Sequence, residues 1–225
     1  MAIQLSQSDY WELIIENDSN WQLYDPADDL DWIGTYPAKL GQGHIRGIQL
    51  QAGLTLDIAN YQLRDDLSLQ SIDREHPIEF TFHLLGGARQ EQFREIHAGM
   101  YGFFGSGMAP GSRGMNLANQ PTQWVSVHME PVLLHSFVGI RSEEIPPEFE
   151  HLIRRSDQES YSRYGTTPLA MQAVVQQIFA VSLLGDNQAR FSRKQSAGVV
   201  GTVPRRGANH PRRQRSRPFA QTRRY

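Results

Sequence analysis

The chain has 225 residues, a formal net charge of −2 and no cysteine. The lack of cysteine excludes disulfides, thiolate metal sites and cysteine nucleophiles, and the lack of an apolar run of about 18 residues argues against a membrane-spanning helix. No basic segment followed by an apolar core opens the chain, so no secretory signal is expected and a cytoplasmic protein is predicted.

Charge divides the chain into two unlike parts. Residues 1–189 carry 24 acidic and 11 basic side chains, whereas residues 190–225 carry 11 basic side chains and no acid. The apolar pattern stops near Gly185, so we predict a folded acidic body and a disordered basic tail over 186–225. The body lacks the basic face that phosphate contacts need, so no DNA-binding residue is expected in it. The tail arginines offer non-specific contacts to nucleic acid or to the acidic body, but a disordered translation product without selected function is favoured.

Residues 1–43 are predicted to form an N-terminal helix and an aromatic-containing flap. Ser6 and Asp9 resemble a capping arrangement for a helix that ends near Ile15. Residues 17–39 are polar, acidic and irregular in pattern. We expect a loop here whose aromatic side chains, among them Trp32 and Tyr36, pack onto the body.

Residues 44–130 have the pattern of short strands. Apolar residues alternate with polar ones on either side of an Ala52-Gly53 turn, and residues 78–84 form the clearest period-two face. Residues 99–114 are glycine-rich and are expected to form a loop. Several short strands at this spacing predict a β-barrel or β-sandwich. If the apolar face of residues 78–84 lines the barrel, then Glu79, Thr81 and His83 point outward.

Residues 131–185 change to a helical pattern, which makes the fold class α+β. Helices are predicted over 131–137 and 147–153, and a third begins after Thr167-Pro168. In the third helix Met171, Val174, Val175, Ile178 and Val181 keep helical spacing, and Leu183-Leu184-Gly185 is expected to end it.

Five stretches of this body resemble one regulator family. They are YPAKLGQG from Tyr36, GIQLQAGLTLDIANYQL from Gly47, REHPIEFTFHLLGG from Arg74, VSVHMEP from Val125 and LIRRSDQESYSRYGTTPLAMQ from Leu152. Their order is similar to the sensor half of AraC-type transcription regulators, closest to the branch with the pyochelin-type siderophore regulators.

The resemblance implies a cupin-like, jelly-roll β-barrel sensor over 44–130 and a linker region of helices over 131–185. It also implies a small-molecule effector, for which a ferric siderophore is the candidate, and no cofactor. Homodimerisation, or pairing with an intact regulator, is expected through the helices, and DNA is a partner of intact relatives only.

The basic tail departs from the family, whose members continue into two helix-turn-helix motifs. One permitted choice of codons for residues 192–200, shifted by one base, encodes LESKALEL, which resembles the family's linker helix. We therefore expect a regulator that is truncated or frameshifted before its DNA-binding domain. Two alternatives stay open, namely a stand-alone small-molecule binding or dimerisation module and a metal-dependent cupin enzyme.

Histidines in or beside the barrel raise the possibility of a metal site. The pairs considered are His83 with Glu79 and His128 with Glu130, because cupin enzymes hold metals with several histidines and a glutamate. The two-histidine cluster with a following glutamate is missing, so no metal site is predicted. The remaining candidates, His44, His76, His97 and His135, are expected to be surface or supporting residues.

No catalytic residue is predicted either. Gly105-Ser106-Gly107 lacks the Gly-x-Ser-x-Gly spacing of a nucleophile elbow, and no lysine or helix start follows it to form a phosphate cradle. Residues 103–108 are instead expected to form a loop, and the chain is predicted not to be an enzyme.

Arginines and aromatic residues remain as ligand-binding candidates. Arg46, Arg64, Arg74 and Arg94 suit an anionic ligand, although pairing with nearby acids, for example Arg74 with Asp73 or Glu75, is the favoured interpretation. Phe80 and Phe82 are assigned to the core. The predicted ligand-binding residues are Trp32, Tyr36, Arg46, Tyr61, Phe103 and Phe104.

Overall fold

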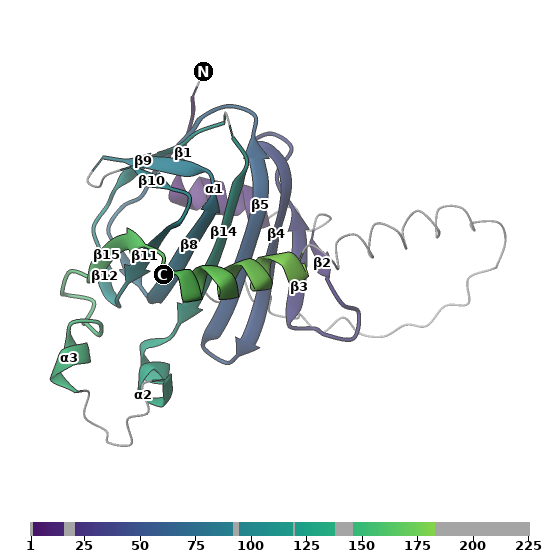
Figure 1. The fold of residues 1–225 in the computed structure, drawn as a ribbon. Coiled ribbons are helices and arrows are strands. Elements are labelled where there is room, and N and C mark those ends of the chain that lie inside the picture. The colour runs from purple at the N-terminus through teal and green to yellow at the C-terminus, as the bar shows by residue number, and fades with distance from the viewer. Residues whose placement is uncertain (1, 16–20, 92–94, 119, 138–145, 183–225) are drawn as a thin grey trace, which may run out of the picture.

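The structure, a computed structural model, describes residues 2–15, 21–91, 95–118, 120–137 and 146–182. Phe93, Arg94, the His135 side chain, the helix end predicted at residues 183–185 and the tail over 186–225 therefore lie outside the described residues. Strands dominate what is described, and helices are few (Figure 1).

The larger sheet has eight antiparallel strands in the order β15-β11-β8-β14-β5-β4-β3-β2. Their bounds are β2 (Trp21–Leu23), β3 (Asp31–Thr35), β4 (Gly41–Gln51), β5 (Leu54–Leu63), β8 (Ile78–Leu85), β11 (Met100–Phe104), β14 (Thr122–Met129) and β15 (Ser162–Thr166). The predicted turn between β4 and β5 is confirmed, and Gly53 adopts a φ of +76° there, a conformation that favours glycine.

Two smaller sheets face the larger one. Five strands have the order β1-β6-β13-β9-β10, and β12 pairs with β7. The bounds are β1 (Ile3–Ser6), β6 (Leu67–Gln70), β7 (Arg74–His76), β9 (Gly87–Gln90), β10 (Ile96–His97), β12 (Gly107–Ala109) and β13 (Arg113–Asn116). Residues of all three sheets line one interior cavity. The described chain thus has a mostly β, cupin-like fold.

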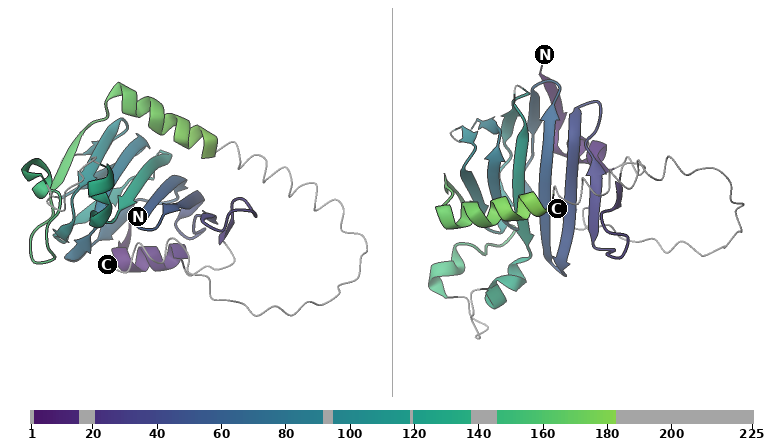
Figure 2. Two further views of the ribbon diagram at one scale, coloured as in Figure 1. Left: turned by 90° about the horizontal axis from the view of Figure 1, so that it is seen from below. Right: turned by 45° about the vertical axis from the view of Figure 1, so that its right-hand side comes forward.

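Helices cover opposite sides of the sheets (Figure 2). The helices are α1 (Gln7–Ile15), the 3-10 helix η2 (Pro131–Leu133), α2 (Leu134–Phe137), α3 (Pro147–Glu150) and a helix over residues 169–182. The predicted cap of α1 is confirmed, since the Asp9 amide donates to Ser6 Oγ at 3.0 Å. None of the helices in the described ranges is long and apolar enough to cross a membrane.

The helix over residues 169–182 packs across the outer face of the large sheet (Figure 1). Val175 and Phe179 are buried in one cluster with Phe82 of β8 and with Leu56 and Ile58 of β5. On the other face of β5, Ala59 and Tyr61 pack in a second cluster with α1. The apolar face of β8 therefore points out of the barrel, because a helix covers it there.

Two loop predictions were wrong. Residues 17–39 contain the strands β2 and β3, which extend the large sheet. Residues 99–114 contain the strands β11 and β12 and the start of β13. The aromatic and glycine residues in both segments hide the alternating pattern by which a strand is recognised. Strands this short are also formed through hydrogen bonds to neighbours that are distant in the sequence, which no local pattern predicts.

Candidate ligand-binding site

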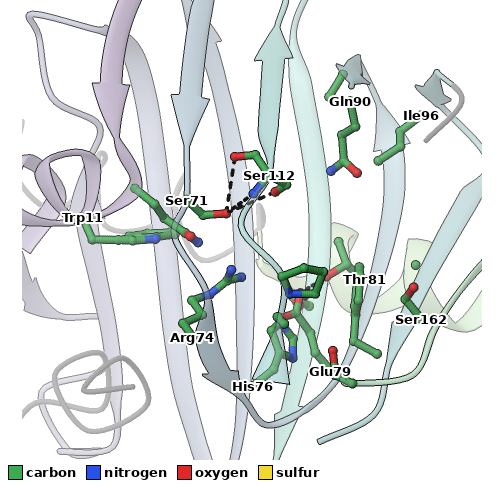
Figure 3. A pocket seen from close by; sticks show the side chains of 18 of the residues that line it. Trp11, Ser71, Arg74, His76, Glu79, Thr81, Gln90, Ile96, Ser112 and Ser162 are labelled. Carbon is green, nitrogen blue, oxygen red and sulfur yellow. Dashed lines mark hydrogen bonds and ion pairs between the residues drawn. The ribbon is translucent and has the colours of Figure 1, made fainter. Parts of the chain in front are cut away.

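A cavity of about 930 Å³ lies between the large sheet and the smaller ones (Figure 3). Its walls come from α1 and from strands of all three sheets. A volume of this size is typical of sites for small organic ligands.

The inner face of the large sheet supplies polar side chains to the cavity. The register of β8 and β14 places Glu79 opposite His128, Thr81 opposite Ser126 and His83 opposite Trp124, and all six residues line the cavity. Glu79, Thr81 and His83 therefore point inward. The conditional expectation that they point outward was wrong, because it took the apolar face of β8 for the lining of the barrel.

Glu79 is the centre of a hydrogen-bonded cluster on this wall. Thr81 and Ser126 donate from their hydroxyls to Glu79 Oε1 at 2.5 and 3.2 Å. His76 Nε2 and His128 Nδ1 lie 3.4 and 3.5 Å from Glu79 Oε2. The carboxylate is thus contacted from several sides, which offsets the cost of placing it in the interior.

The two histidines of this cluster share Glu79 Oε2 as a neighbour, and His128 has a second carboxylate beside it. His128 Nε2 lies 3.2 Å from Asp57 Oδ2, so the two ring nitrogens of His128 face two different carboxylates. Glu130 lies next to the Gly53 turn. Within the described ranges no group of three or more histidine, aspartate or glutamate residues is arranged to hold a metal ion.

Burial alters the charge state of two histidines in the cavity. The pKa of His76 is lowered mainly by burial, against an opposing effect of Glu79. Burial likewise lowers the pKa of His83 to about 4. Both imidazoles are therefore neutral near pH 7, and a neutral imidazole offers one donor and one acceptor.

Arg74 provides the one arginine side chain among the described residues that line the cavity. It is partly buried on β7, and desolvation lowers the pKa of its guanidinium. The favoured pairing with Asp73 or Glu75 was wrong, since neither forms an ion pair with it. Asp73 instead accepts a hydrogen bond from the Gly111 amide at 2.7 Å.

Aromatic rings complete the lining. Trp11, Tyr61, Phe104, Trp124 and Tyr164 all contribute to the wall. The Phe104 ring lies 5.3 Å from the His76 ring and 5.5 Å from the Tyr164 ring. The cavity therefore combines flat aromatic surfaces with a lining in which most of the other residues are polar.

The structure brings two of the six predicted site residues into the cavity, Tyr61 and Phe104. Tyr36 stacks behind Tyr61 at a centroid distance of 4.3 Å. Phe103 stacks on Phe80 at 4.1 Å, on the outer face of the sheet. Trp32 donates its indole N–H to the Asp29 carbonyl at 2.9 Å.

Arg46 has partners away from the cavity. Its Nε donates to Asp31 Oδ1 at 2.8 Å, and its guanidinium carbon lies 3.4 Å from the centre of the Tyr24 ring. Through the contact with Asp31, Arg46 on β4 stabilises the pairing of β4 with β3.

Sequence reasoning missed several lining residues, including Trp11, Ser71, Gln90, Trp124 and Tyr164. The alternation in β14 was a usable signal, because Trp124, Ser126 and His128 share one face at a spacing of two. The others come from α1, β9, β15 and the segment after β6, and no local pattern links these elements.

The chain matches the family described as "Regulatory protein PchR N-terminal domain" over residues 42–190. No curated protein matches the chain. Among solved structures, ToxT from Vibrio cholerae strain SCE256, with unsaturated fatty acid bound, is 9% identical with a TM-score of 0.39. The match covers 66% of this chain and 55% of the ToxT chain.

A second solved structure is the pirin YhhW from Escherichia coli in complex with nickel(II), which is 10% identical with a TM-score of 0.32. It covers 63% of this chain and 53% of the pirin chain. The chain thus spans little more than half the length of these proteins. At these low TM-scores the likenesses identify neither a ligand nor an activity.

The family match defines a class, the sensor domain of a transcription regulator. The chain belongs to the PchR N-terminal domain family, which provides the sensor domain of AraC-type regulators.

Proposed function

We propose that the chain acts in the cytoplasm as the effector-sensing portion of an AraC-type regulator and that the interior cavity is its effector site. The observation that carries this proposal is the cavity of about 930 Å³, whose lining combines five aromatic rings with many polar side chains. The family relationship supports a siderophore, in its ferric form, as the effector. In intact relatives the response would be passed to DNA.

The route for the signal in this proposal runs through β8. Thr81 and His83 face the cavity, while Phe82 between them packs against Val175 and Phe179 of the helix over residues 169–182. A ligand that prefers one position of β8 would therefore bias the position of this helix. The linker role predicted for residues 131–185 is part of the same proposal.

The test is to fill the cavity. Ala88 lines it, whereas Ala52 is exposed in the β4–β5 turn. The probes are iron(III) complexes of phenolate, catecholate and hydroxamate siderophores, and the readout is quenching of tryptophan fluorescence in the full chain. We expect at least one complex to bind the natural chain and the Ala52→Trp variant but not Ala88→Trp. Equal binding by both variants overturns the cavity as the effector site, and binding of none of the complexes overturns the siderophore assignment.

A second function, pairing with another copy or with an intact regulator, rests on a separate observation. Four apolar side chains of the 169–182 helix are 46–82% exposed, and they are Leu169, Met171, Val174 and Val181. Exposed apolar surface of this kind is characteristic of interaction sites. Light scattering of the natural chain and a Val174→Glu/Val181→Glu variant tests this, and a monomer at high concentration in both argues against self-association.

A further inference from the structure

Arg74 differs from the other arginines of the described chain because it lines the cavity without an ion-pair partner. In Figure 3 its guanidinium lies in the cavity on the same side as Trp11 and Ser71. Within the described part of the chain its side chain makes no hydrogen bond or ion pair, and its electrostatic neighbours are Glu79 and His76.

Three other arginines of the sheets have carboxylate partners. Arg46 pairs with Asp31, Arg89 with Glu95 and Arg113 with Glu91. The last two pairs are exposed, so these side chains are also solvated. Arg74 is less exposed than either, yet it has neither a paired carboxylate nor full contact with water.

A partly buried guanidinium without a partner carries an unfavourable desolvation energy. Its planar group has five N–H donors in a fork that fits the two oxygens of a carboxylate or a similar oxyanion. Glu79 does not meet this requirement, because its oxygens are already contacted by Thr81, Ser126, His76 and His128.

The rest of the lining sets a limit on negative charge. Four exposed acids lie around the cavity, and they are Glu12, Asp73, Glu75 and Glu159. The other cavity groups with hydrogen-bonding capacity include His83, which is neutral near pH 7. A ligand with several negative charges would meet repulsion that only one guanidinium opposes.

We infer that the effector carries a single oxyanion group, which pairs with Arg74, on a flat body that lies among the aromatic rings of the cavity. This inference rests on the proposed function, because it assigns the chemical class of the ligand in the same cavity. It distinguishes monoanionic aromatic ligands from polyanionic chelates and from neutral molecules.

The test uses three probes of the same size and shape on the full chain. They are 2-naphthoate with one carboxylate, 2-naphthamide with none and naphthalene-2,6-dicarboxylate with two. Binding is followed by ligand-observed NMR for the natural chain, for Arg74→Gln and Arg74→Lys, and for the control Arg163→Gln. Arg163 is exposed on β15 and does not line the cavity.

We expect 2-naphthoate to bind most tightly, and Arg74→Gln to weaken it by about tenfold to a hundredfold, the range for a hydrogen bond to a charged group. Arg74→Lys keeps the positive charge but not the planar guanidinium, so it should reduce the affinity for 2-naphthoate less than Arg74→Gln does. Arg163→Gln should leave the affinity unchanged, and 2-naphthamide should not respond to Arg74→Gln. Circular dichroism verifies that each variant is folded.

Two results overturn the inference, and they can be told apart from failure of the proposed function. If naphthoate and naphthamide bind equally and Arg74→Gln changes neither, the cavity binds ligands but Arg74 is not an anion site. If the dicarboxylate binds best, the limit to one negative charge is wrong. If no probe binds and Ala88→Trp also leaves siderophore binding unaltered, the cavity itself is not the effector site.

Discussion

Tyr36 and Tyr61 stack with ring centroids 4.3 Å apart and ring planes within 6° of parallel. Tyr61 lies on β5 and lines the cavity, while Tyr36 follows β3 and is only 1% exposed. The Tyr36 hydroxyl also lies 3.2 Å from that of Tyr10 in α1. One buried ring therefore connects α1, the end of β3 and the wall of the cavity.

We expect Tyr36→Ala to lower the free energy of unfolding by about 3–5 kcal/mol, because it leaves a cavity beneath Tyr61. Tyr36→Phe keeps the ring and loses only the hydroxyl contact, so it should cost about 1 kcal/mol. Urea unfolding measures both. Equal losses for the two variants would mean that the hydroxyl contact, and not the stacking, is responsible.

Substitution of Arg46 separates a structural role from a ligand-binding role. The side chains of Arg46 and Asp31 are 11% and 8% exposed, so Arg46→Met leaves a buried carboxylate unpaired and should cost about 3 kcal/mol in urea unfolding. Removal of Arg155 from its exposed pair with Asp157 should cost less than about 1 kcal/mol. Because Arg46 lies outside the cavity, folded Arg46→Met should bind an effector normally. Loss of binding would support the sequence-based assignment of Arg46 to the ligand site.

Arg74→Met should have the opposite effect on stability. Without ligand, the guanidinium is a desolvated charge with no ion pair among the described residues, so an apolar replacement should raise the free energy of unfolding by about 1 kcal/mol or more. The exposed Arg163→Met serves as the control and should change it by less than about 0.5 kcal/mol. Chemical unfolding of the ligand-free chain measures these free energies. A clear loss of stability in Arg74→Met would instead show a structural role for the guanidinium.

The pH dependence of stability follows from His83. Its pKa is about 4 in the folded chain and 6.5 as the ordinary value, so the unfolded chain binds more protons between these limits. The free energy of unfolding should therefore fall as the pH drops from 6.5 towards 4, by up to roughly 3 kcal/mol from this residue.

Unfolding measured at pH 7.5 and pH 5 compares the natural chain with His83→Gln, which should show a shallower fall. His97→Gln, at an exposed position, should retain the natural profile. An unchanged slope in His83→Gln would assign the pH dependence to other groups.

The sequence by itself determined the local structure wherever one short stretch holds all the necessary information. Ser6 and Asp9 predicted the start of α1, and the Ala52-Gly53 pair predicted the turn between β4 and β5, because capping and turn chemistry act over a few residues. The alternation over residues 78–84 also established that β8 has one apolar and one polar face. The ordered set of motifs led to the AraC-type sensor family.

The direction of those faces was decided only by the tertiary structure. A period of two separates Phe80 and Phe82 from Glu79, Thr81 and His83, but it does not say which set points inward. The helix over residues 169–182, about ninety residues further along the chain, covers Phe82 from outside and so leaves the polar set to line the cavity.

The partners of the arginines were likewise decided by the tertiary structure. In the sequence Arg74 lies between Asp73 and Glu75, whereas Arg46 has no acid within ten residues on either side. Strand pairing brings Arg46 to Asp31, whereas β7 places Arg74 in the cavity with no paired carboxylate among the described residues. Charge pairing depends on distances across the fold of a few ångströms, and those distances are not encoded in any single segment.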